Sequence, residues 1–169
     1  MKTSLKLNSI LPLAVMIIAS AFAVAPVANA KNLQVAGTIE TTEEQVVTPP
    51  TMKVELEGIG HATGLGCFVL DIDTTVLLAT SYGTGVIAID TGCGNTLSGT
   101  IVGQGSPKPG VDAVPVIGTM TITGGTGRFL GASGTLTIKR ILSRSTGVST
   151  GTIEGTITLP DRCRFSRRH

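Results

Sequence analysis

A short unit of glycine, threonine and an apolar residue recurs along the chain and constrains the fold more than any other feature. It begins at Gly37, Gly99, Gly118, Gly134, Gly151 and Gly155. The four glycines from Gly99 to Gly151 follow one another at spacings of 19, 16 and 17 residues. This cadence fits successive strands of an antiparallel meander that bend at glycine. The threonine and the apolar residue then point to opposite faces. Because closing such a sheet removes its edges, a barrel is favoured over an open sheet.

Period-two alternation of polar and apolar residues extends the β prediction, most clearly in Lys53–Glu57. Predicted strands of the domain lie at 53–57, 66–72, 75–80, 84–90, 96–103, 114–123, 134–141 and 150–159. Residues 33–39, ahead of the domain, could form a further short strand. The segments between them are rich in Gly, Pro, Asn and Ser, which supply turn geometry. After the first thirty residues, no window has helical periodicity with caps. The fold class predicted is all-β, a small closed antiparallel barrel of about eight strands.

The first thirty residues have the pattern of a secretory signal peptide. Lys2 and Lys6 precede an apolar stretch at 10–24, and Ala28-Asn29-Ala30 forms a cleavage site. An uncleaved membrane anchor is the competing reading, since about 20 apolar residues can span a bilayer. The prolines and the cleavage site favour removal, so we expect a secreted or periplasmic protein that begins at Lys31.

Cleavage would leave 139 of the 169 residues, enough for one domain. Removing Lys2 and Lys6 lowers the basic residues from 13 to 11, equal to the 11 acidic ones, so net charge indicates no nucleic-acid partner. We predict an N-terminal extension or linker at 31–51, a barrel domain at 52–160 and a basic tail at 161–169. That tail is expected to be a solvated terminus.

Three cysteines in an exported protein suggest one disulfide and one remaining thiol. Cys67 and Cys93 fall within the predicted barrel and are the pair we expect, with Cys163 left in the tail. Free buried thiols are an equally ordinary outcome. No Cys-x-x-Cys or Cys/His cluster is present, so we predict no metal site.

The segment Thr121–Gly134 resembles the Gly-Gly-Thr/Ser-Gly-x-Phe-x-x-Ala-x-Gly segment of plant allene oxide cyclases and dirigent proteins. Together with Gly60–Phe68, it resembles more closely the bacterial secreted proteins with an allene oxide cyclase-like or dirigent-like barrel. The resemblance spans about 52–159. It implies an eight-stranded antiparallel barrel and, from the plant families, a trimer with a pocket at the barrel mouth. No catalytic residue of the cyclases aligns with this chain, so the resemblance carries over no activity.

Two sequence patterns match catalytic motifs without the context those motifs need. Gly147–Gly151 matches Gly-x-Ser-x-Gly, but an alternating strand follows it instead of a helix. Gly125–Gly131 is reminiscent of a dinucleotide loop, yet its third glycine comes one residue late and no helix follows. We interpret both as turns, and we predict no catalytic residue and no cofactor.

Polar residues within the barrel region are the candidates for lining a pocket. Asp71 and Asp73 lie two apart and would share one face of a strand. Paired carboxylates can divide acid and base roles, although exposed strand-end aspartates are the commoner case. The predicted ligand-binding set is Asp71, Asp73, Tyr82, Arg128 and Glu154. His61 is interpreted as a hydrogen-bonded structural residue.

The small number of aromatic residues argues against several functions. After the signal peptide only Phe68, Tyr82, Phe129 and Phe165 remain, and the chain has no tryptophan. Outer-membrane barrels have aromatic girdles, and single-stranded nucleic-acid grooves need stacking platforms. The first hypothesis is therefore a non-catalytic exported barrel that binds a small apolar ligand. The alternatives are an isomerase or cyclase resembling allene oxide cyclase, and a structural or oligomeric surface protein.

Overall fold

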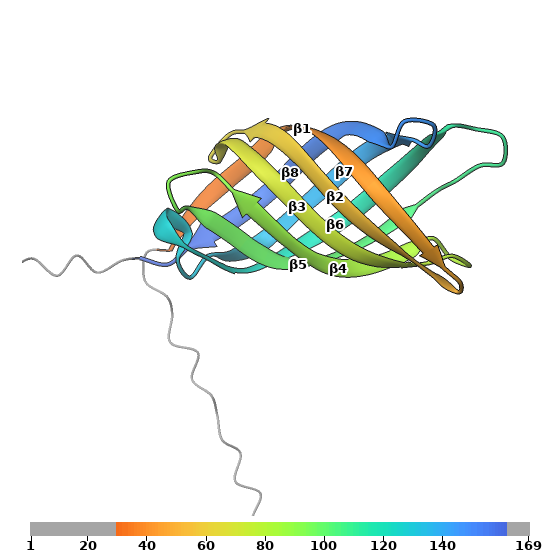
Figure 1. Ribbon diagram of the computed structural model, residues 1–169. Helices are drawn as coiled ribbons and strands as arrows, with labels where there is room; N and C mark the ends of the chain where they lie inside the picture. The colour runs from red at the N-terminus through yellow and green to blue at the C-terminus, as the bar shows by residue number, and fades with distance from the viewer. Residues whose placement is uncertain (1–29, 162–169) are drawn as a thin grey trace, which may run out of the picture.

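The computed structural model describes residues 30–161 and has eight antiparallel strands that close into one barrel, each paired with its sequence neighbours (Figure 1). The strands are β1 Lys31–Thr48, β2 Thr51–Ala62, β3 Gly66–Leu77, β4 Tyr82–Asp90, β5 Thr96–Gly105, β6 Ala113–Gly125, β7 Ser133–Ser143 and β8 Val148–Leu159. A single 3-10 turn, η1 Gly127–Phe129, lies between β6 and β7. The predicted all-β closed barrel is confirmed. Within the described residues, no helix is long and apolar enough to cross a membrane.

The barrel includes a segment that was predicted to lie outside it. Residues 31–51 were predicted to be an extension or linker, but 31–48 form β1, which closes the barrel between β2 and β8. The acidic residues at 40, 43 and 44 obscured the strand, although Val35, Ile39 and Thr41 of the same strand face inward and are buried. Pro49 and Pro50 form the β1–β2 turn.

The predicted number of strands is correct, but the residues that form two of the strands differ from those predicted. The segment 66–72 and the first part of 75–80 belong to one strand, β3, which ends at Leu77, so β1 supplies the eighth. The predicted signal peptide and basic tail lie outside the described residues, apart from Ala30 and Asp161 at their borders.

The packed core fills the end of the barrel that carries η1. Inward side chains of all eight strands contribute to it, including Leu70, Ile89, Leu97 and Ile153, each with no exposed surface. Phe129 projects from η1 into this core and is also fully buried. Because Phe129 and Leu65 fill the space between the turns, this end is closed.

Five of the six recurring glycines, all except Gly118, lie where two strands approach too closely for a side chain. At Gly99, an added Cβ would lie 2.0 Å from the carbonyl oxygen of Thr121 on β6. The β5–β6 register shifts between Ser98 and Gly99, which marks an irregularity of the bulge type. In the same unit Thr100 is exposed and Ile101 is buried, which confirms that the two side chains face opposite sides.

Candidate functional site: the cavity at the barrel mouth

The end of the barrel opposite η1 contains a cavity of about 650 Å³. Four connections lie at this end, β1–β2, β3–β4, β5–β6 and β7–β8, and the last three contribute Ser81, Pro107 and Arg144 to the lining of the cavity. Its inner boundary is formed by residues that also belong to the packed core: Leu56, Ile72, Ile101 and Ile138. The barrel interior is therefore filled in one half and hollow in the other.

A row of three glycines creates much of this space. Gly83 of β4 is the register partner of Gly103 in β5, and Gly103 is the partner of Gly118 in β6. All three line the cavity. Since neighbouring inward positions on three strands carry no side chain, the wall there is thin, and the volume that side chains would otherwise occupy stays open.

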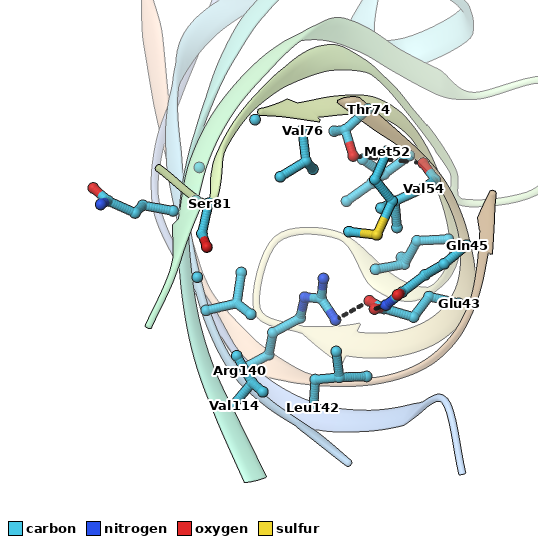
Figure 2. Close-up of a pocket in the computed structure, with 18 of the residues that line it drawn as sticks. Glu43, Gln45, Met52, Val54, Thr74, Val76, Ser81, Val114, Arg140 and Leu142 are labelled. Atoms are coloured by element: carbon cyan, nitrogen blue, oxygen red, sulfur yellow. Dashed lines mark hydrogen bonds and ion pairs between the residues drawn. The ribbon is translucent and has the colours of Figure 1, made fainter. Parts of the chain in front are cut away.

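An ion pair lies in the cavity wall among apolar side chains (Figure 2). The Nη1 atom of Arg140 on β7 is 2.6 Å from Oε2 of Glu43 on β1. The two side chains are only 11% and 3% exposed, respectively. The other carboxylate oxygen, Oε1 of Glu43, accepts a 2.5 Å hydrogen bond from the side-chain amide nitrogen, Nε2, of Gln45.

Two buried hydroxyls extend this polar group across the barrel wall. Arg140 Nη1 also donates to Ser149 Oγ at 2.9 Å, and Ser149 Oγ is 2.6 Å from Oγ1 of Thr41. Ser149 and Thr41 are each 2% exposed. We call Thr41, Glu43, Arg140 and Ser149 the wall cluster. It comes from β1, β7 and β8, which barrel closure brings together.

None of the four residues of the wall cluster was among the predicted site residues, although the alternation pattern contains a signal for two of them. Arg140 has the same period-two phase as Leu136, Ile138 and Leu142, all of which face the interior. Glu43 has the same phase as Ile39 and Thr41 in β1. A charged residue in the apolar phase of a strand points inward, and that criterion would have identified both residues.

Asp71 and Asp73, predicted to line a pocket, lie on the outer face of β3. Their alternation with buried Leu70 and Ile72 directs both carboxylates away from the interior. In register they face Glu57 and Glu55 of β2, respectively. The structure therefore brings the two aspartates together with other carboxylates, but outside the cavity. Within residues 30–161, no group of three or more His, Cys, Asp or Glu side chains could hold a metal ion.

The other three predicted ligand-binding residues also lie outside the cavity. Tyr82 is 41% exposed on β4, and Glu154 forms an exposed ion pair with Lys139 on the outer face. Arg128 lies at the closed end, where its Nη2 donates to the Leu65 carbonyl at 2.8 Å and its guanidinium stacks over the Phe129 ring. It closes a turn there and has no access to the mouth.

Cys67 and Cys93 are free and exposed, so the predicted disulfide between them is not formed. Cys67 is near the start of β3, on the outer face opposite His61 of β2. Cys93 lies in the β4–β5 turn with a left-handed backbone, φ 55°. Cys163 lies outside the described residues.

At the mouth, Asp112 connects the β5–β6 loop to the β7–β8 turn. Its carboxylate accepts hydrogen bonds from Ser143 Oγ and from the Ser145 amide, both at 2.7 Å. The hydrogen bond from Ser143, followed by that from Ser145, lowers the pKa of Asp112 below its ordinary value of 3.8. Two of the four connections around the mouth are thus joined to each other.

Comparison with known proteins supports the fold. No family model matches the sequence, and no curated protein matches it. Among solved structures, the chain is similar to the pterocarpan synthase dirigent protein GePTS1, with a TM-score of 0.58 and 15% sequence identity. The match covers 92% of this chain and 98% of that chain. At this identity the likeness concerns the fold alone, and the fold is a closed eight-stranded barrel of the dirigent type.

Proposed function

We propose that this protein is an exported, non-catalytic carrier that binds a small, mainly apolar molecule in the cavity at the barrel mouth. The observation that carries the proposal is the half-hollow interior, with a cavity of about 650 Å³ above a packed floor. A barrel with only a structural role would be expected to fill its interior with side chains instead of placing three neighbouring glycines there. The volume lies within the range of about 300–1,000 Å³ typical of small-molecule sites.

The lining of the cavity supports an apolar ligand. Met52, Val54, Val76, Val114 and Leu142 surround the open space (Figure 2). Burying a ligand against them removes apolar surface from water, which is favourable by roughly 25 cal/mol per Å². The similar barrel of GePTS1 belongs to a protein described as a pterocarpan synthase, so the likeness in fold does not by itself favour binding over catalysis.

Native mass spectrometry of the protein purified from its own host tests the proposal directly. We expect a small molecule to be retained and to be released on unfolding. A cavity-filling variant supplies the matched test. Gly118→Leu adds a side chain whose Cβ first meets the flexible end of Ile101, at 3.1 Å, so the strand can accept it. Thr119→Leu makes a similar change on the outer face of the same strand.

We expect Gly118→Leu to weaken retention at least roughly tenfold and Thr119→Leu to leave it unchanged. Equal retention in both variants would mean that the molecule binds elsewhere. A protein that carries nothing, and takes up no apolar probe after purification, would favour the structural alternative.

Export and assembly belong to the same proposal. β1 begins at Lys31, directly after the predicted cleavage site, so removing residues 1–30 would leave every strand of the barrel complete. Intact-mass measurement should find Lys31 at the mature N-terminus. The resemblance to the plant families suggests a trimer, and the same native spectrum reports the oligomeric mass.

The wall cluster supports a second candidate function, an isomerase or cyclase. Glu43 and Arg140 place a carboxylate and a guanidinium beside an apolar cavity, which is an arrangement suited to moving a proton in a sheltered site. Conversion of the retained molecule to an isomer of equal mass during incubation would favour the isomerase or cyclase function over simple binding. Glu43→Gln should then abolish the conversion.

A further inference from the structure

Arg140 has hydrogen-bond donors that the protein leaves available to the cavity. A guanidinium carries five N–H donors. Within residues 30–161, both side-chain hydrogen bonds of Arg140 come from Nη1, one to Glu43 and one to Ser149, while Nη2 and Nε have no partner. No buried side-chain nitrogen or oxygen in this part of the chain lacks a partner, so these donors face space that solvent can reach. Figure 2 places the guanidinium inside the cavity.

Glu43, in contrast, offers the cavity almost no accessible surface, because its side chain is only 3% exposed and each of its carboxylate oxygens already accepts one hydrogen bond. One oxygen accepts from Arg140 and the other from Gln45. The carboxylate therefore fixes the guanidinium in place without offering a second strong site. The polar group that the wall cluster presents to a ligand is a donor, and it calls for an acceptor atom on the ligand.

The ion pair also determines the charge that the ligand can carry. Glu43 already neutralises Arg140 at 2.6 Å, and its side chain is 3% exposed. A carboxylate ligand on Nη2 or Nε would be attracted by Arg140 but also repelled by Glu43, so little Coulomb energy is left to offset the loss of its hydration in a site shielded from water. The other cation that the described residues contribute to the lining, Arg144, is exposed to solvent at the mouth. A neutral carbonyl, ether or hydroxyl oxygen accepts the same hydrogen bond without this repulsion.

The apolar lining of the cavity determines the chemistry of the rest of the ligand. From Arg140 inward, the cavity is bounded by Leu56, Ile72, Ile101 and Ile138, which offer no side-chain hydrogen-bonding group. A bound molecule would place its apolar body on this floor and its oxygen beside Arg140, nearer the mouth. A second polar group at the inner end would be desolvated without compensation, at a cost of several kcal/mol in an apolar medium.

We infer that the natural ligand is an uncharged, largely apolar molecule with one acceptor oxygen that binds Arg140, and that Glu43 excludes the corresponding carboxylic acids. This inference rests on the proposed binding function and specifies its ligand class. Glu43 acts here as a specificity-determining residue through its effect on Arg140.

Three matched probes test the ligand class by calorimetry at neutral pH: acetylnaphthalene, naphthoic acid and ethylnaphthalene. They share one apolar body and differ in carrying a neutral acceptor, an anion or no polar group. We expect acetylnaphthalene to bind the wild-type protein roughly tenfold more tightly than either of the others. Gly118→Leu should weaken all three.

Glu43→Gln should invert the selectivity, because it leaves the positive charge of Arg140 without a counter-ion. Naphthoate should then bind roughly tenfold more tightly than acetylnaphthalene and should raise the melting temperature of this variant. The control is Glu154→Gln, the same substitution in the exposed pair with Lys139 on the outer face. It should leave the wild-type order intact.

If Glu43→Gln does not fold, the double variant Glu43→Gln/Arg140→Met removes both charges, and acetylnaphthalene and ethylnaphthalene should bind it equally. Wild-type protein that binds all three probes alike, or the acid most tightly, overturns the ligand class while the proposed binding function stands. Wild-type protein that binds none of them, and in which Gly118→Leu changes nothing, overturns both.

Discussion

Lys139 and Arg140 are consecutive residues of β7 that form ion pairs on opposite faces of the barrel wall. Lys139 Nζ lies 2.5 Å from Glu154 Oε1 on the outer face, where both side chains are more than half exposed. Arg140 Nη1 lies 2.6 Å from Glu43 Oε2 inside the barrel. The period-two alternation of a strand thus separates a surface pair from an interior pair by one residue.

The two pairs should differ sharply in their effect on stability. Arg140→Met leaves the Glu43 carboxylate buried without its cation, and we expect the free energy of unfolding to fall by about 3–5 kcal/mol. Lys139→Met removes an exposed pair and should cost less than about 1 kcal/mol. Urea denaturation of both variants measures the difference. Equal losses would mean that the interior pair is solvated as well as the outer one.

Gly99→Ala should destabilise the barrel through a backbone collision. The added Cβ would lie 2.0 Å from the Thr121 carbonyl oxygen, which cannot move without disturbing the β5–β6 pairing. We expect a loss of about 1–3 kcal/mol in the free energy of unfolding. Gly124→Ala is the control, since its Cβ would meet only Ser98 Oγ, at 3.8 Å. A stable Gly99→Ala protein would show that the two strands separate easily there.

Asp112 should contribute to stability in a pH-dependent way. Its pKa is lowered in the folded protein by hydrogen bonds from Ser143 and then Ser145. A depressed carboxyl pKa adds stability above the unfolded value, near pH 3.9, and that stability is lost as the pH falls through the folded value. The melting temperatures of wild type and Asp112→Asn should therefore differ at neutral pH and converge in acid. A gap that stays constant with pH would contradict the role of this carboxylate.

The two described cysteines should behave as free thiols. Cys67 and Cys93 are both exposed, so iodoacetamide should alkylate each of them in the folded protein. A reducing agent should leave the melting temperature unchanged, because no loop between these residues is closed by a bond. Peptide mapping of the alkylated protein identifies the modified positions. A lower melting temperature after reduction, together with protection of both residues, would restore the predicted disulfide.

Much of the fold could be predicted from local pattern. The Gly-Thr-apolar cadence and the alternation within each segment led to an all-β closed barrel, and both act over neighbouring residues. The boundaries failed where charge dominated the pattern. In β1 the outward residues at 40 and 44 are acidic, and only the pairing of this strand with β2 and β8 shows it to be part of the wall.

The candidate site depended on tertiary structure almost entirely. Asp71 and Asp73 were chosen because they are polar and two apart, but they alternate with buried Leu70 and Ile72 and so face outward. Gly83, Gly103 and Gly118 form one row only through the registers of β4, β5 and β6. A sequence has no local signal for register between strands, since register arises from the packing of the whole sheet.

By itself, then, the sequence determined that this chain alternates and turns at glycine, because those properties follow from the conformational preferences of adjacent residues. It also favoured a closed barrel, because closure removes the edges of such a sheet. Only the tertiary structure decided that Glu43 and Arg140, 97 residues apart, meet in the wall of a cavity. Their contact requires β1 to reach β7 across β8, and barrel closure alone brings these strands together. Barrel closure therefore produces both the interior ion pair and the cavity beside it. The ligand chemistry that we infer follows from these two features.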